Sequence, residues 1–128
     1  MQKPLLWIIA ASQIVLGALT LFLPLSFFGW MGLTVPPADT GYMIGLLGAR
    51  FVAYGIGMAM LARQAEPSRF WMGNMLLIQL IDFAVGASYL SRGIVDLSVL
   101  AFPMTNAALF SAGLAFVLLV PRRAGLPA

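Results

Sequence analysis

The sequence contains no cysteine and no histidine, and only 9% of its residues are charged. Without cysteine the chain can form no disulfide, no thiolate nucleophile and no cysteine-bound metal site. Without histidine it lacks the commonest ligand of haem and transition metals and the usual proton shuttle. These two absences exclude more functions than any motif in the chain suggests.

Charge is scarce because the chain is apolar almost throughout. Hydrophobic residues make up 62% of the 128 residues and the mean hydropathy is +0.99, whereas about a quarter of the residues of a soluble domain are charged. We therefore expect residues 1–128 to form a single integral membrane domain. The net charge of +3 is small. The basic residues lie at segment ends, so they indicate membrane topology and not a nucleic-acid surface.

Four apolar runs are long enough to cross a bilayer, which takes roughly 20 residues of helix. The predicted helices cover residues 5–23, 41–62, 70–90 and 98–120, so the expected fold is an all-α bundle of four transmembrane helices. Pro103 falls in or near the first turn of the last helix, where a missing N–H costs little. The first run resembles a signal peptide, but it is longer than a usual h-region and no convincing small-x-small cleavage site follows it. We expect it to be a retained helix.

The longest predicted connection runs from Pro24 to Thr40. Phe27, Phe28 and Trp30 suit the lipid–water boundary, and Val35-Pro36-Pro37 suits a stiff extended segment. We expect a plain connecting loop that lies on the membrane. The alternative is a small lid or a partner-docking patch.

The distribution of lysine and arginine predicts the topology. One side of the predicted membrane carries five of the seven basic residues, which are Lys3, Arg63, Arg69, Arg122 and Arg123. The opposite loops contain Asp39, Arg92 and Asp96. We therefore expect both termini to be cytoplasmic, in a bacterial-type inner membrane.

Small residues recur every four positions in the second predicted helix, at Gly41, Gly45, Ala49, Ala53 and Gly57. Small residues allow a second backbone to approach closely. The stripe rotates about 160° round the helix at 100° per residue, which is more than one neighbouring helix covers. We therefore expect one end of it, Gly41–Gly45, to pack against another protein chain or an ordered lipid.

Arg50 and Asp82 are charged residues within predicted membrane helices. Arg50 follows Tyr42 by eight residues and Asp82 precedes Leu90 by eight, so both lie about 12 Å below the outer ends of antiparallel helices. Each unpaired charge would cost about 2.5–3.5 kcal/mol on insertion scales. This matched depth predicts an Arg50–Asp82 pair.

Further polar residues occur at comparable depths on the other predicted helices. Together with the charged pair they form the predicted polar cluster, whose members are Arg50, Asp82, Gln79, Asn106, Gln13 and Tyr54. One interpretation is a structural clasp that fixes which helices meet and in what register. The other is a small pocket that binds a lipid head group, a quinone ring or an anion.

No catalytic arrangement is evident in the sequence. Asp82 is the only acidic residue in a predicted membrane segment, so no paired-carboxylate site forms there, and no nucleophilic triad or metal-ligand cluster is present. Gly55-Ile56-Gly57 lies inside a predicted membrane helix and is not a nucleotide-binding loop. We expect no enzymatic activity and no cofactor other than a bound lipid or quinone.

The segments GARFVAYGIGMAMLAR and LIQLIDF resemble small four-helix bacterial inner-membrane proteins of the DoxX-like kind. In that family a G-x-R near the start of the second helix is followed by further glycines, as in Gly48-Ala49-Arg50 and Gly55 here. The resemblance implies a four-helix fold and an accessory role, since some members are linked to quinone-dependent or redox complexes. Small multidrug transporters are similar in size, but they carry an essential acidic residue in the first helix. This chain has Gln13 there, which argues against proton-coupled export.

These observations predict a non-catalytic accessory or scaffold subunit of a larger membrane complex. Its expected partners are membrane lipids and another membrane protein or a second copy, with no nucleic acid. The alternative is a small carrier or a lipid- or quinone-binding membrane protein that uses the polar cluster.

Overall fold

A computed structural model describes residues 2–120, with the side chain of Tyr42 left out of the description. The described chain is entirely helical, apart from its turns and loops. It contains one short helix and four long ones: α1 (Gln2–Phe22), α2 (Pro24–Trp30), α3 (Thr40–Arg63), α4 (Arg69–Ser91) and α5 (Leu97–Leu119).

The four long helices confirm the four predicted apolar spans. The largest difference in their bounds is at the start of α1, which begins at Gln2 and not at Leu5. Each of the four is long and apolar enough to cross a membrane. Because α5 begins at Leu97, Pro103 lies inside that helix, where its nitrogen cannot donate a hydrogen bond to the carbonyl one turn before it.

The prediction of a plain loop between residues 24 and 40 was wrong for its first part, which forms α2. Pro24 occupies the first turn of this helix, where its fixed φ favours helical geometry and its missing N–H costs little. Gly32 follows with a φ of +77°, a conformation that glycine adopts without steric cost. Val35 to Pro37 form neither helix nor strand, as their composition predicted.

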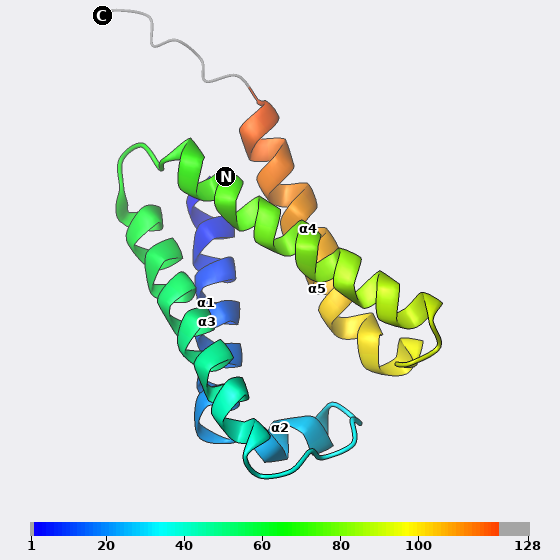
Figure 1. Cartoon of the computed structure of the whole chain (residues 1–128). Coiled ribbons are helices and arrows are strands. Elements are labelled where there is room, and N and C mark those ends of the chain that lie inside the picture. The colour runs from blue at the N-terminus through cyan, green and yellow to red at the C-terminus, as the bar shows by residue number, and fades with distance from the viewer. Residues whose placement is uncertain (1, 121–128) are drawn as a thin grey trace, which may run out of the picture.

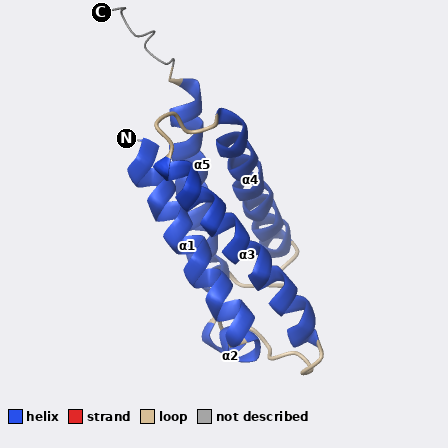
Figure 2. Ribbon diagram, turned by 90° about the vertical axis from the view of Figure 1, so that its left-hand side faces the viewer, coloured by secondary structure: helices blue, strands red, loops and turns tan. Residues whose placement is uncertain are grey.

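The long helices form two antiparallel pairs, α1 with α3 and α4 with α5. Figure 1 shows that the two pairs meet at one end and diverge toward the other, where α2 lies beside the ends of α1 and α3. Figure 2, turned by 90°, shows α1 and α3 side by side, with α4 and α5 beyond them. The beginning of α1 and the end of α5 lie at the end where the pairs meet.

The apolar core lies where the two pairs meet. It combines side chains from all four long helices, which are Leu6, Ile9, Ala10, Met58, Leu61, Ala62, Met72, Met75, Phe110, Leu114 and Val117. Arg69 donates a hydrogen bond to the carbonyl of Leu118 and so joins α4 to the end of α5. The Arg63 guanidinium lies 6.0 Å from the ring centre of Trp7, a cation–π contact between α3 and α1.

Glycines set the close approach of α1 and α3. A Cβ added at Gly17 would lie 2.7 Å from the Val52 nitrogen, and one at Gly55 would lie 2.9 Å from the Ala10 carbonyl oxygen. A Cβ added at Gly48 would lie 2.7 Å from the Leu21 nitrogen. These distances are shorter than a real Cβ contact, so only glycine permits this backbone-to-backbone packing.

The packing positions on α3 recur every seven residues and not every four as predicted. Seven residues return to within about 20° of the same face, whereas each step of four rotates the face by about 40°. Gly48 and Gly55, and Gly41 one heptad earlier, therefore share the face toward α1, where a Cβ on Gly41 would lie 3.6 Å from the Pro24 side chain. The predicted stripe rotates away from the face that packs on α1, and its members Ala49 and Ala53 are exposed.

The Gly41–Gly45 end of the stripe is half-buried within the chain, and its contact with another chain or an ordered lipid stays a prediction. A Cβ on Gly45 would lie 4.0 Å from the Leu21 side chain. The opposite end is open, and nothing lies within 4 Å of a Cβ added at Gly57. The Gly57 end of the stripe is therefore the more open of the two.

Candidate functional site

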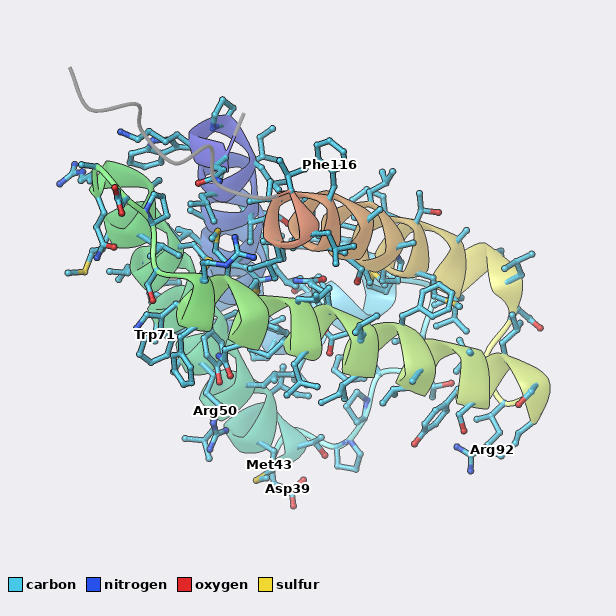
Figure 3. All side chains as sticks on the ribbon, turned by 90° about the horizontal axis from the view of Figure 1, so that it is seen from above. Asp39, Met43, Arg50, Trp71, Arg92 and Phe116 are labelled. Atoms are coloured by element: carbon cyan, nitrogen blue, oxygen red, sulfur yellow. The ribbon has the colours of Figure 1, made fainter. Side chains whose placement is uncertain are left out.

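Arg50 lies on the face of α3 opposite to α1. It follows Gly48 by two residues, which is a rotation of about 200° on a helix, so a Gly48 that packs on α1 directs Arg50 away from it. The Arg50 side chain is exposed, and in Figure 3 it lies at the periphery of the molecule, outside the ribbon of α3. The G-x-R motif thus combines a close-packing glycine with an outward-facing cation.

The residues around Arg50 form an exposed and otherwise largely apolar surface, which we call the Arg50 face. Its members lie three, four or seven residues from Arg50 and are Met43, Leu46, Leu47, Arg50, Ala53, Tyr54 and Gly57. Met43 is 61% exposed and Tyr54 is 39% exposed. Tyr54 was predicted to belong to the interior cluster, and that prediction was wrong because Tyr54 shares the outward face of Arg50.

Asp82 lies on α4, in the other helix pair, and is also exposed. It lies about 14 Å along the helix from Ser91, and Arg50 lies about 15 Å along its helix from Thr40, so the two residues lie at similar distances from their helix ends. The predicted ion pair does not form within the chain: no salt bridge joins Arg50 to Asp82, and α3 and α4 share no extended contact. The distance from a helix end fixes only the position along that helix, and the two helix pairs diverge away from the end where they meet (Figure 1).

Asp82 has its own exposed surroundings, which we call the Asp82 face. They lie beside the buried face of α4 and are Trp71, Ile78, Asp82, Val85 and Tyr89, of which Ile78 is half-buried. At the Ser91 end of this face the Arg92 guanidinium lies 4.5 Å from the ring centre of Tyr89. Arg92 appears at the far end of α4 in Figure 3.

Two of the predicted cluster residues, Gln13 and Gln79, are buried. Gln13 is 4% exposed and Gln79 is 2% exposed, and each follows a core residue by one turn, Ile9 on α1 and Met75 on α4. Gln79 donates its amide to the Met75 sulfur at 3.6 Å, and a thioether is a weak acceptor. Within residues 2–120 the Gln13 side chain makes no hydrogen bond. Both amides therefore retain hydrogen-bonding capacity where the helix pairs begin to diverge.

Ser111 is a polar group that the sequence interpretation missed. Its hydroxyl is buried and has no hydrogen-bond partner among the described residues. On the antiparallel helices α4 and α5, Gly86 faces Met104, since a Cβ on Gly86 would lie 2.9 Å from that side chain. Gln79 lies seven residues from Gly86 toward the start of α4, and Ser111 lies seven residues from Met104 toward the end of α5. Both steps are about 10 Å in the same direction, so Gln79 is level with Ser111. Serine is common in apolar helices, so its sequence context alone does not mark it.

Asn106, the remaining predicted residue, is half-buried on α5. The predicted cluster therefore divides into two groups. Gln13 and Gln79 are buried near the core, whereas Arg50, Tyr54 and Asp82 are on outward faces. The single clasp predicted from depth alone does not form within one copy of the chain.

Two hollows in the described surface are lined by none of the six predicted residues. One, of about 410 Å³, lies at the end where the pairs meet and is lined by residues that include Lys3, Pro67 and Phe116. Another, of about 530 Å³, lies between Phe83 and one side of α5 and is almost wholly apolar. Among residues 2–120 no group of three acidic residues could hold a metal ion.

The helices thus define an all-α chain with four potential membrane spans, two diverging helix pairs and two exposed charged faces. Its sequence matches no known protein-family profile and no curated protein, and its fold matches no solved structure. The resemblance to DoxX-like proteins stays a prediction.

Proposed function

We propose that the chain is a multi-pass protein of a bacterial-type inner membrane, with both termini cytoplasmic, and that it is a non-catalytic accessory or scaffold subunit. The observation that carries the proposal is the exposure of Arg50 on an apolar face halfway along α3. A scaffold subunit needs a surface that its own fold leaves uncovered, and the Arg50 face is such a surface.

The energetic argument follows from the position of Arg50. An arginine at the centre of a membrane helix costs about 2.5–3.5 kcal/mol on insertion scales, and such residues usually pair or face a polar cavity. Arg50 has no ion-pair partner within residues 2–120, and its helix face cannot turn toward α1 while Gly48 and Gly55 pack there. An acidic or amide group from a second protein removes this cost and makes the contact specific.

The experiment is purification of the protein in a mild detergent from its native membrane, followed by native mass spectrometry. We expect a complex with at least one further protein chain, and we expect Arg50→Leu to remove that chain. Arg92→Leu is the matched control, because it removes the same charge from the end of α4. A protein that is monomeric before and after both substitutions contradicts the proposal.

A second candidate function is binding of a lipid head group or a quinone ring. It is favoured by the buried hydrogen-bonding groups of Gln13, Gln79 and Ser111, which are not fully used within the described chain. Neutral amides and a hydroxyl suit carbonyl oxygens of a neutral ring. Organic extraction of the purified protein tests this function, since a bound quinone or lipid should be present at a fixed molar ratio and should be lost in Gln79→Leu.

A further inference from the structure

We propose that the partner of the Arg50 face is a second copy of this chain, placed so that Arg50 of each copy pairs with the partner's Asp82. This inference rests on the proposed function and specifies its partner. It accounts for the one exposed cation and the one exposed acid that lie within the long helices away from their ends, Arg50 and Asp82.

The first argument is charge complementarity at equal depth. Arg50 lies about 15 Å from the outer end of α3 and Asp82 about 14 Å from the outer end of α4. Two copies that insert with the same orientation, with these helix ends at the same membrane surface, therefore present their opposite charges at about the same level. Neither charge has an ion-pair partner in its own described chain, so both are available.

The second argument is symmetry. A two-fold axis parallel to the membrane normal, just outside the surface between Arg50 and Asp82, places each arginine beside the partner's aspartate. The contact is isologous and closed, which is the commonest form of homodimer. Two ion pairs form at once, so no intramembrane charge of either copy is left unpaired.

The third argument is the shape of the Arg50 face. Ala53 and Gly57 lie on its inner half, and a Cβ at Gly57 would meet nothing within 4 Å. Small residues allow a helix of the partner to approach closely. The inner half of the Asp82 face supplies the larger side chains of Ile78 and Trp71, which fit against small ones. The small residues of the Arg50 face and the larger side chains of the Asp82 face therefore complement each other, which supports the contact of α3 with the partner's α4.

The test uses the absence of native cysteine. Leu47 lies one turn outward of Arg50 on α3, and Val85 lies one turn outward of Asp82 on α4; they are 42% and 52% exposed. The inference brings Leu47 of one copy close to the partner's Val85. Two differently tagged copies, one with Leu47→Cys and one with Val85→Cys, are produced together in membranes and oxidised. A disulfide that joins the two tags can then form only between copies.

The matched control replaces Val85→Cys by Phe102→Cys, at similar depth on α5. Phe102 is 80% exposed, so random collisions would cross-link it at least as well as residue 85. We expect the Leu47–Val85 pair to form the two-tag product and the Leu47–Phe102 pair to form several-fold less. Equal yields from the two pairs would overturn the inference.

Charge exchange then tests the ion pair itself. When only one of the two copies carries a substitution, either Arg50→Asp or Asp82→Arg, one of the two intermolecular pairs has like charges. We then expect cross-linking to fall to the level of the control pair. When one copy carries Arg50→Asp and the other carries Asp82→Arg, both pairs are opposite in charge again, and we expect the two-tag product to return. If Arg50 and Asp82 instead paired within one copy, each substituted copy would have like charges at the two positions, and mixing the copies would not restore the pair. A two-tag product that does not return therefore overturns the inference.

The outcomes also separate this inference from the proposed function. If Leu47→Cys cross-links to a different membrane protein and never to the partner's Val85, the second-copy inference is wrong while the scaffold role stands. If Leu47→Cys cross-links to no protein and Arg50→Asp changes nothing that co-purifies, both are wrong.

Discussion

A methyl group added at Gly48 tests the packing of α1 against α3, on which the outward direction of Arg50 depends. The new Cβ in Gly48→Ala would lie 2.7 Å from the Leu21 nitrogen and the Thr20 hydroxyl and 2.9 Å from the Gly17 carbonyl oxygen. Ordinary contacts begin near 3.4 Å. The helices must therefore separate by about 0.7 Å at this point, and the backbone atoms of α1 cannot rotate away as a side chain would.

The magnitude follows from two opposing terms. Overpacking of a tight contact costs about 1–3 kcal/mol, and the backbone neighbours of Gly48 favour the upper part of that range. Alanine regains up to about 1 kcal/mol of helix propensity over glycine. We therefore expect Gly48→Ala to lower the free energy of unfolding by about 1–2 kcal/mol.

Gly57→Ala is the matched control on the same helix, and Gly73→Ala is a second control on α4. A Cβ at either position has open space around it, so only the propensity gain remains and we expect neutral or stabilised variants. Equilibrium unfolding in mixtures of SDS and a mild detergent, followed by tryptophan fluorescence, measures the difference. If Gly48→Ala is as stable as the two controls, the glycine-mediated packing of α1 on α3 is wrong.

Further predictions concern the topology, the outward face and the buried amides. Reporter fusions after Ala128 and near Pro36 should report cytoplasmic and external locations respectively; the reverse result would place the open end of the bundle inside the cell. Arg50→Leu should leave the unfolding transition of the detergent-purified monomer within about 0.5 kcal/mol of the unmodified protein, as for other exposed positions, and a larger loss would show that Arg50 has a partner within its own chain. Gln79→Leu should be neutral or stabilising in the absence of a ligand, because an apolar side chain of similar size replaces a poorly paired buried amide. Destabilisation in the same SDS titration would show that Gln79 is fully hydrogen-bonded.

The sequence predicted the long helices well because their determinants are local. Each is a predominantly apolar run of about 20 residues, and length and hydropathy together indicate a membrane-type helix. The short helix α2 was missed because seven residues are too few to show a periodic pattern. Its strongest local determinant is Pro24 in the first turn, and proline also ends helices.

The choice of packing face could not be made from α3 alone. Gly41, Gly45 and Gly57 fit a repeat of four, while Gly41, Gly48 and Gly55 fit a repeat of seven. The position of Gly17 on α1 decides between them, because Gly17 lies against Gly48 and Val52. Such a contact depends on two segments about 30 residues apart, and the pattern of one helix does not encode it.

The distances of Arg50 and Asp82 from their helix ends were predictable, but the separation of the two residues was not. Counting residues gives the distance along a helix because the rise per residue is fixed. The lateral positions depend on how the two helix pairs pack, and these pairs share their core only at one end. Gln13 and Gln79 lie next to that core and are buried, as the predicted interior required.

The central claim is that the Arg50 face lies against protein within the membrane. Tyr54 lies on this face, so replacing it with a benzophenone amino acid places a photo-cross-linker of similar shape there, and Phe102 on α5 is the control position. On irradiation of intact membranes we predict a discrete protein adduct from position 54 and mainly lipid adducts from position 102. Lipid adducts alone from position 54 would contradict the account.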